Sequence, residues 1–310
     1  MEVLYNIQYS QPLTALLRGL LINLGLSFQH SEFPMTEKAD QFFSELKTAV
    51  ESDQLVLPTL PEVAIKIREA VEGESTSAHQ IADILTQDAS LSARLIQVSN
   101  SPLYRSRNPI EDLQMAVTRL GIRMVRDLVV SLAMKQIYQA TSDVLDEHFR
   151  RSWNTSVEVA AICRMLATTV PGINPEQALL AGLIHNIGAL PILVLAEDDE
   201  DLFNNSDALG DIIEELQGPV GGLILETWNF GKAMTEVVKQ AENFHYDHEG
   251  GANLVDLVQV SLLQGGHIQK EIDWSGVPAF SKLGMDTEVN VVEIEENQEM
   301  IESTKQSLLM

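Results

Sequence analysis

The residues most suited to chemistry lie in the stretch GLIHNIGAL at positions 182–190, where His185 is followed directly by Asn186. A neutral imidazole is a common ligand of transition metals, and a carboxylate beside it would add charge and could bridge two ions. The asparagine offers an uncharged amide oxygen instead, which is a poor bridging ligand. The pair therefore raises the question of whether this chain holds a catalytic metal.

A second group of metal-ligating side chains lies in FHYDHEGG, residues 244–251, which contains His245, His248 and Glu249. If this segment were helical, His245 would share a face with both His248 and Glu249, because residues three and four apart are neighbours on a helix. That face could hold a divalent metal such as Fe, Mn or Zn. The two glycines that end the segment favour the other interpretation, a polar loop between helices.

The single cysteine, Cys163, lies in the apolar context AAICRML, which predicts a buried small side chain rather than a nucleophile. One cysteine excludes an internal disulfide framework and favours a cytoplasmic location. The formal charge of −25 would repel phosphate backbones, so we expect no nucleic-acid partner. The cluster of Arg119, Arg123 and Arg126 is a local basic exception, which we interpret as a solvated helix face.

Residues 13–28, LTALLRGLLINLGLSF, are apolar but only sixteen long, and Arg18 and Asn23 interrupt them. A membrane-spanning helix needs about 20 apolar residues, and a secretory signal needs a basic segment that is missing before Arg18. We therefore treat residues 1–35 as an N-terminal extension of uncertain role, either an amphipathic flap or the result of a start site upstream of Met35. Neither interpretation predicts an integral membrane segment.

The rest of the hydrophobic pattern is helical almost throughout. Apolar residues recur at three- and four-residue spacing over 36–52, which predicts a helix with one buried face. Ser77 and Gln80 form a capping box, and Asp88 or Ser90 can cap the following helix. Further helices are expected at about 111–120, 122–139, 143–169, 175–187, 189–197, 208–217, 219–228, 232–243 and 251–265. No stretch alternates strictly, so no sheet is expected and the predicted fold class is all-α.

Four stretches together resemble the HDOD family, the signalling-associated branch of the HD-domain metal-dependent phosphohydrolase superfamily. They are LPTLPEVAIKI at 57–67, IADILTQDASLSARLIQVSNSPLY at 81–104, IEDLQMAVTRLGIRMVRDLVV at 110–130 and ALLAGLIHNIGAL at 178–190. The resemblance covers roughly residues 36–265 and implies an HD-domain-like helical bundle with a smaller N-terminal helical lobe. We accordingly expect the lobe at 36–140, the bundle at 141–285 and an acidic C-terminal tail at 286–310.

In HD-domain hydrolases a histidine, a His-Asp pair and a distal aspartate hold the metal, and further histidines join where two metals bind. The resemblance places the pair at His185-Asn186 and the distal aspartate at Asp256. The remaining ligand positions carry other residues, which are Thr155, Gln217, Ala241 and Glu242. Because catalytic metals normally keep at least three protein ligands, we expect no catalytic residue and no metal or other cofactor. We also expect a buried His185 hydrogen-bonded to Asp256.

The resemblance implies a non-catalytic regulatory module that binds a signalling protein or a small regulatory ligand. A candidate partner-binding loop is NSPLYRSR, through Asn100, Ser101, Tyr104, Arg105 and Arg107, because loops carry recognition and Tyr and Arg are frequent anchors. A structural interpretation of the loop stays open, in which Asn100 caps the preceding helix and Tyr104 fills a gap between the lobes. The alternative function is a metal-dependent phosphohydrolase with a reduced or displaced metal site.

Overall fold

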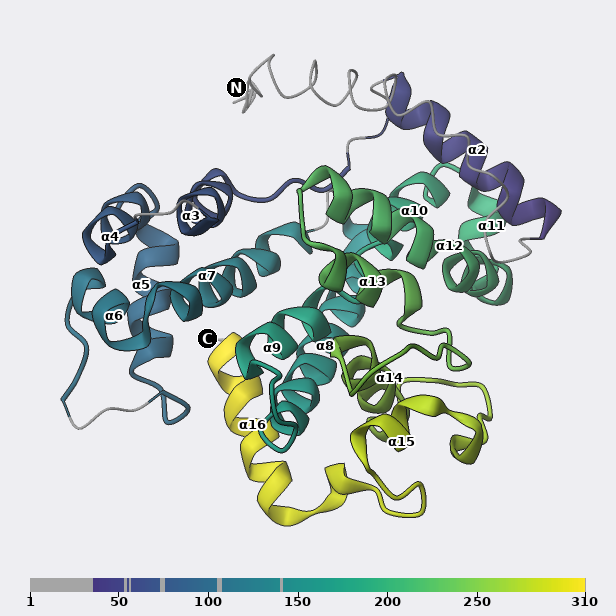
Figure 1. The fold of residues 1–310 in the computed structure, drawn as a ribbon. Coiled ribbons are helices and arrows are strands. Elements are labelled where there is room, and N and C mark those ends of the chain that lie inside the picture. The colour runs from purple at the N-terminus through teal and green to yellow at the C-terminus, as the bar shows by residue number, and fades with distance from the viewer. Residues whose placement is uncertain are drawn as a thin grey trace.

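The structure is a computed structural model that describes residues 36–52, 55, 57–72, 76–104, 108–139 and 142–309. Within these ranges every regular element is a helix and no strand occurs, which confirms the all-α fold class. Figure 1 shows a small group of helices on one side of the molecule and a larger bundle on the other. Helix α7 (Ile122–Ile137) runs from the first group into the second.

The N-terminal lobe consists of four short helices that precede α7. They are α3 (Glu62–Glu72), α4 (Ala78–Leu85), α5 (Ala89–Ser99) and α6 (Leu113–Leu120). The predicted caps are present, since Ser77 and Gln80 form the capping box of α4 and Asp88 accepts a hydrogen bond from the Leu91 amide at the start of α5. Gly121 adopts a φ of 86°, a conformation that favours glycine, and this allows α7 to follow α6 directly.

Helix α7 belongs to both parts of the molecule, because it packs against α3 on one side and against α9 (Pro175–Ile184) on the other. The basic cluster predicted as one solvated helix face is divided between two helices, with Arg119 on α6 and Arg123 and Arg126 on α7, and two of its members bond to the protein. Arg126 pairs with the buried Asp127 at 2.6 Å, and Arg119 donates to the Asn108 carbonyl oxygen at 2.6 Å. Burial raises the pKa of Asp127, while the Arg126 guanidinium acts in the opposite direction. Arg123 is exposed.

The bundle is built around α8 (Asp143–Ala167), a long helix whose C-terminal half is almost wholly buried and which packs most closely against α9. The other helices of the bundle are α10 (Ala189–Ala196), α11 (Glu200–Phe203), α12 (Ser206–Thr227), α13 (Lys232–Gln240) and α14 (Leu254–Gln264). After α14 come η1 (Trp274–Gly276), α15 (Pro278–Leu283), η2 (Val291–Glu293) and α16 (Glu295–Leu309).

Helix α12 corrects the prediction of two helices divided at Pro219, because it continues through the proline to Thr227. Proline removes a backbone donor and normally kinks or ends a helix. Here the neighbouring glycines bring α12 very close to α13: a Cβ added to Gly218 would lie 3.2 Å from the Lys239 carbonyl oxygen. This packing against α13, together with that against α10, overrides the local signal.

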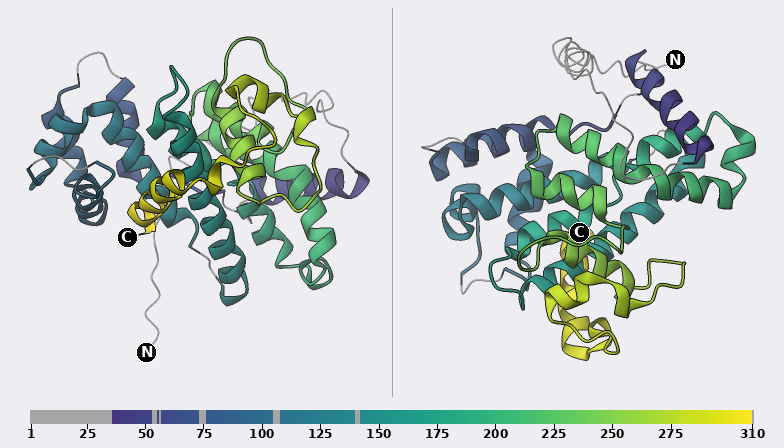
Figure 2. Two further views of the ribbon diagram at one scale, coloured as in Figure 1. Left: turned by 90° about the horizontal axis from the view of Figure 1, so that it is seen from below. Right: turned by 45° about the vertical axis from the view of Figure 1, so that its right-hand side comes forward.

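Helix α2 (Glu37–Glu51) corrects the expected lobe boundary, because it packs on α12 and α10 of the bundle rather than on the N-terminal lobe (Figures 1 and 2). Its predicted apolar face is present and buries Phe42 and Leu46. At its start the Thr36 backbone amide donates to Glu215 Oε2 of α12 at 2.8 Å. The physical reason for the correction is that the amphipathic pattern shows which face is buried but not which surface covers it.

The acidic C-terminal segment is largely folded, in contrast to the plain tail that its charge suggested. Helix α16 lies along α8 and ends beside α7, as Figure 1 shows. It buries Ile301, Thr304 and Leu308, which recur at helical spacing. Its end is fixed by Arg94 of α5, which donates to the Leu308 carbonyl oxygen at 3.2 Å, so this helix contacts both parts of the molecule.

One stretch of the described chain, Pro175–Ala196, is long and apolar enough to cross a membrane by length and composition alone. However, 89% of its most apolar window is buried inside the protein, as expected for helices of a protein core. The apolar segment 13–28 and the rest of residues 1–35 lie outside the described residues.

Candidate functional site

His185 and Asn186 lie in the turn that joins α9 to α10, not within a continuous helix as the sequence suggested. Two glycines press this turn against its neighbours. A Cβ added to Gly182 would lie 2.4 Å from Ala160 Cα on α8, and one added to Gly188 would lie 2.0 Å from the Gln217 carbonyl oxygen on α12. The stretch GLIHNIGAL is therefore held between two helices at a spacing that only glycine permits.

The Asn186 side chain is turned toward the protein interior and is 8% exposed. Its Oδ1 accepts a hydrogen bond from the Tyr138 hydroxyl at 2.7 Å and lies 2.8 Å from the Ser156 hydroxyl. Its Nδ2 donates to the Ser152 carbonyl oxygen at 3.2 Å. Since an amide oxygen has two lone pairs, this oxygen is fully engaged by the protein.

His185 is buried beside it and is 2% exposed. Its Nδ1 lies 2.7 Å from the Gly182 carbonyl oxygen, and because a carbonyl oxygen only accepts, Nδ1 must carry the proton. Burial lowers the pKa of His185 to about 4; the contact with Gly182 raises it and His267 lowers it further. The ring is thus neutral near pH 7, and its Nε2 is a hydrogen-bond acceptor.

Gln217 of α12 and Glu242, just after α13, form a second polar pair. Gln217 Nε2 donates to Glu242 Oε1, and Gln217 is only 7% exposed. Burial raises the pKa of Glu242, although the hydrogen bond from Gln217 works against that rise. The two positions that the resemblance implies as former ligand positions therefore carry a neutral amide and a carboxyl group that bind each other.

These two features line one open cavity of about 220 Å³. Of the seven positions inferred for a former metal site, the structure brings five to its wall, which are Thr155, His185, Asn186, Gln217 and Glu242. The apolar part of the wall is formed by Ala189, Leu193, Ile213 and Leu262. The cavity is consequently polar at one part of its wall and aliphatic at another, as in many small-molecule sites.

Several lining residues were not predicted from the sequence. His148, Arg151 and Ser152 of α8 lie seven, four and three residues before Thr155 and so share its helical face, a signal that was available once Thr155 was identified. His267 follows α14 and carries no motif that would have identified it. Burial lowers its pKa, and its Nε2 lies 3.7 Å from Glu158 Oε2.

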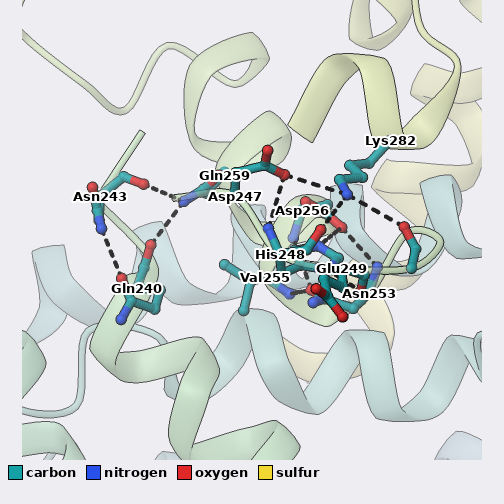
Figure 3. A network of polar contacts seen from close by, with 11 residues as sticks. Gln240, Asn243, Asp247, His248, Glu249, Asn253, Val255, Asp256, Gln259 and Lys282 are labelled. Carbon is teal, nitrogen blue, oxygen red and sulfur yellow. Dashed lines mark hydrogen bonds and ion pairs between the residues drawn. The ribbon is translucent and has the colours of Figure 1, made fainter. Parts of the chain in front are cut away.

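Asp256 and Ala241 are not among the residues that line the cavity. Asp256 is fully buried, accepts from the Asn253 amide at 2.7 Å and lies 2.9 Å from His248 Nε2 (Figure 3). The predicted hydrogen bond between His185 and Asp256 is therefore wrong. Asp256 instead completes the N-terminal capping box of α14 with Asn253, while Leu262, two turns along the same helix, reaches the cavity.

The segment FHYDHEGG forms a loop between α13 and α14, so His245, His248 and Glu249 do not share a helical face. His248 contacts Asp256, and Lys282 of α15 donates to the His248 carbonyl oxygen and lies 3.3 Å from Asp247 Oδ1 (Figure 3). These contacts hold the loop between α14 and α15. The displaced metal site that we considered for these residues has no geometric support.

In the described part of the candidate partner-binding loop, the side chains make contacts within the protein, as the structural interpretation of the loop predicts. Asn100 ends α5 and exchanges hydrogen bonds with the backbone of Ile110, and Ser101 is buried. The Tyr104 hydroxyl donates to Glu176 Oε2 of α9 at 2.5 Å, and Arg164 of α8 donates to the other oxygen of Glu176 at 3.1 Å. Tyr104 thus joins the lobe to the bundle, and burial raises its pKa well above the usual value. Arg105 and Arg107 lie outside the described residues.

Cys163 is fully buried on α8, and its sulfur lies 3.2 Å from the Ser261 hydroxyl of α14. Burial raises the pKa of its thiol to about 12, so almost no nucleophilic thiolate is present near neutral pH. The residue has the properties of a small core side chain.

The cavity does not fit the metal site that the resemblance to HD-domain hydrolases implies. The Asn186 oxygen is engaged by Tyr138 and Ser156, and Glu242 is bonded to Gln217. In the part of the chain that the structure describes, no three His, Cys, Asp or Glu side chains gather closely enough to hold an ion. This donor set falls short of the three protein ligands that catalytic sites usually supply.

Comparisons with known proteins agree with this architecture. A family model described as the HDOD domain matches residues 57–244. A solved structure from Shewanella amazonensis SB2B, assigned to the metal-dependent phosphohydrolases, is 32% identical with a TM-score of 0.75, and the match covers 88% of this chain and 100% of that one.

Two more distant structures share the fold. An HDOD domain protein of unknown function from Geobacter sulfurreducens is 20% identical with a TM-score of 0.63, over 86% of this chain and 99% of its own. A Marinobacter aquaeolei VT8 protein assigned to signal transduction is 21% identical with a TM-score of 0.63, over 88% and 67%. An uncharacterized protein of Treponema pallidum (strain Nichols) is 22% identical over 236 residues, which are 72% of this chain and only 44% of that relative. The chain thus spans less than half the length of this curated relative.

Proposed function

Because this chain belongs to the HDOD domain family, we propose that it is a non-catalytic regulatory module of bacterial signal transduction. In this proposal the cavity beside His185 binds a small regulatory ligand or a group of a partner protein and releases it unchanged. The observation that carries the proposal is the inward hydrogen bonding of Asn186 to Tyr138, Ser156 and Ser152. The side chain at the central position of the inferred metal site serves the fold and has no free lone pair for an ion.

The chemistry of the cavity supports the same proposal. Phosphoester hydrolysis in metal enzymes needs a bound ion to produce hydroxide near neutral pH, and the donor set here does not fit one. A metal-free route would need a nucleophile activated by a nearby base. Thr155 is the candidate hydroxyl nucleophile, and no hydrogen bond joins it to His185 within the described residues. The proposal includes no cofactor and no nucleic-acid partner. It places the protein in the cytoplasm.

A second candidate function is a metal-dependent phosphohydrolase with a reduced metal set. The observation that favours it is the 32% identity with the Shewanella amazonensis protein, which is assigned to that class. This candidate requires that His185 bind an ion through Nε2, the nitrogen that does not contact Gly182.

Metal analysis of the purified chain separates the two candidates. We expect no stoichiometric Fe, Mn or Zn, and no cleavage of bis(p-nitrophenyl) phosphate when Mn²⁺ is added. A His79→Ala variant provides the matched control, because His79 is exposed and lies outside the cavity. Stoichiometric metal that is lost in His185→Ala but kept in His79→Ala would overturn the proposal and establish the hydrolase.

A further inference from the structure

Three side chains of the cavity wall, His185, Gln217 and Glu242, each have a hydrogen-bond acceptor that the protein does not use. The proton of His185 is fixed on Nδ1 by the Gly182 carbonyl oxygen, so the atom available to an occupant is the bare Nε2. Asn186, the neighbouring amide, has its oxygen engaged by Tyr138 and one of its two N–H groups engaged by the Ser152 carbonyl oxygen. An occupant of this part of the cavity must therefore supply a hydrogen to His185.

Gln217 and Glu242 add two acceptors to the same wall. Gln217 uses its amide nitrogen to donate to Glu242 Oε1, which leaves Gln217 Oε1 and Glu242 Oε2 without a protein partner in the described part of the chain. The Glu242 carboxyl group is largely buried, and no cation among the described residues contacts it; Lys270, which acts on it at longer range, is bonded to Glu214. A carboxylate in this position is stabilised by a cation that enters the cavity.

Another part of the wall is aliphatic. Leu193 and Leu262 are each 2% exposed, and Ile213 lies beside them on α12. A saturated carbon chain of a few methylene groups would bury its apolar surface here. The wall therefore suits an occupant with an apolar stem and a polar end.

The balance of charge around the cavity favours a cation as well. Arg151 is the basic side chain of the wall that is always charged, but it is 72% exposed and pairs with Glu147 at 3.1 Å. The chain as a whole carries a formal charge of −25, and such a field raises the local concentration of cations and repels anions. A phosphate or carboxylate ligand would meet Glu242 and find no buried cation in the described wall.

The geometry points to a primary alkylammonium group as the occupant, with its three N–H donors on His185 Nε2, Gln217 Oε1 and Glu242 Oε2 and its stem against the aliphatic wall. An ammonium has three donors and no acceptor, which matches the three acceptors. The group can come from a free aliphatic amine or from a lysine side chain of a partner protein. This inference rests on the proposed function, since it names the chemical class that the non-catalytic cavity binds.

NMR titration of the full chain with n-butylammonium chloride tests the inference. We expect saturable shifts of the Gln217 side-chain amide and of the Gly188 backbone amide, with a dissociation constant in the millimolar range. N-butyltrimethylammonium has the same charge but no N–H donor, so we expect its binding to be at least about tenfold weaker. Equal binding of n-butyltrimethylammonium or of butyrate, or no shift with n-butylammonium, would overturn the inference.

Two variants locate the binding within the protein. Glu242→Gln keeps the size of the side chain and removes its charge, and we expect it to weaken n-butylammonium binding about tenfold. Glu249→Gln makes the same change on an exposed side chain of the nearby loop and should leave binding unchanged. Equal losses in the two variants would show that the amine responds to overall charge and would refute the assigned site.

A parallel titration with a lysine tripeptide, acetyl-Gly-Lys-Gly-amide, identifies the source of the ammonium group. Its affinity is compared with that of n-butylammonium. Tighter binding of the peptide, lost when norleucine replaces lysine, assigns the cavity to a partner protein; weaker binding assigns it to a free amine. Both outcomes support the ammonium. If no amine binds and the protein hydrolyses no phosphodiester, the ammonium inference is refuted and the proposed function stands. Metal-dependent hydrolysis would refute the proposed function.

Discussion

Replacing Asn186 with aspartate would create a His-Asp pair like the one in HD-domain hydrolases, and we predict from the structure that this variant loses stability without gaining activity. The Nδ2 group, which donates to the Ser152 carbonyl oxygen at 3.2 Å, would become a second carboxyl oxygen. An ionised carboxylate would then place two acceptors against each other in a site that is only 8% exposed. The Tyr138 and Ser156 hydroxyls would still donate to Oδ1 and offset part of this cost.

The size of the destabilisation is set by whichever protonation state of the introduced aspartate, protonated or ionised, costs less free energy. Keeping the carboxyl group protonated preserves a donor to Ser152 but costs about 1.4 kcal/mol for each pH unit above the ordinary aspartate pKa, or about 4 kcal/mol at pH 7. Ionisation costs the lost hydrogen bond and an unpaired carbonyl oxygen, about 1–3 kcal/mol. We therefore expect a destabilisation of roughly 2 kcal/mol at pH 7. Near pH 5 the protonated state costs only about 1.5 kcal/mol, so the deficit shrinks as the pH falls.

Urea unfolding at pH 7 and pH 5 measures both values, and elemental analysis with a phosphodiester substrate and Mn²⁺ measures metal and activity. Asn205→Asp is the matched control, because Asn205 is an exposed N-cap of α12 where aspartate is equally favourable. We expect that control to lie within about 0.5 kcal/mol of the original chain. An Asn186→Asp chain of unchanged stability that binds Mn²⁺ and cleaves the substrate would show that the inward hydrogen bonds do not define this position.

Three further predictions concern buried groups. Because the pKa of His185 is about 4 in the fold and 6.5 ordinarily, the unfolded state gains a proton first as the pH falls; lowering the pH from about 8 to 5.5 should remove about 1.4 kcal/mol of stability. A His185→Gln chain should lack this component in urea titrations, whereas the exposed-site variant His79→Gln should keep it. Cys163 should react with a thiol reagent only after urea unfolding, and rapid labelling of the folded chain would contradict its burial. Leu308→Ala should lower the free energy of unfolding by about 2–4 kcal/mol, and a change below about 0.5 kcal/mol would show that α16 is not docked.

Local signals in the sequence predicted the helix starts well. The capping box of Ser77 and the cap at Asp88 depend on neighbours within three residues, and the structure has both. Pro219 is also a local signal, and it misled because α12 is held on both sides by α10 and α13. The destinations of α2 and α16 could not be predicted, since an apolar stripe does not identify the surface that covers it.

The resemblance to the HDOD family, more than the chemistry of single residues, predicted which residues share the candidate site. It grouped Thr155, Gln217 and Glu242 with His185, and all four line the cavity although they are far apart in the sequence. The prediction is wrong at Asp256, where a local signal indicates a different role. Asn253 and Asp256 stand three residues apart before an apolar run, which is the spacing of a capping box, and the structure shows that box at the start of α14.

Asn186 joins three parts of the chain through its side-chain hydrogen bonds. Tyr138, which donates to its oxygen, follows directly after α7, the helix that packs on both lobes, and Ser152 and Ser156 lie on α8. The amide needs both its donor and its acceptor to join these elements, and a carboxylate would supply acceptors alone. The Asn186 side chain therefore forms a junction between α7, α8 and the cavity wall. The Asn186→Asp substitution alone therefore removes the hydrogen bond to Ser152 from that junction, and we expect it not to create a metal site.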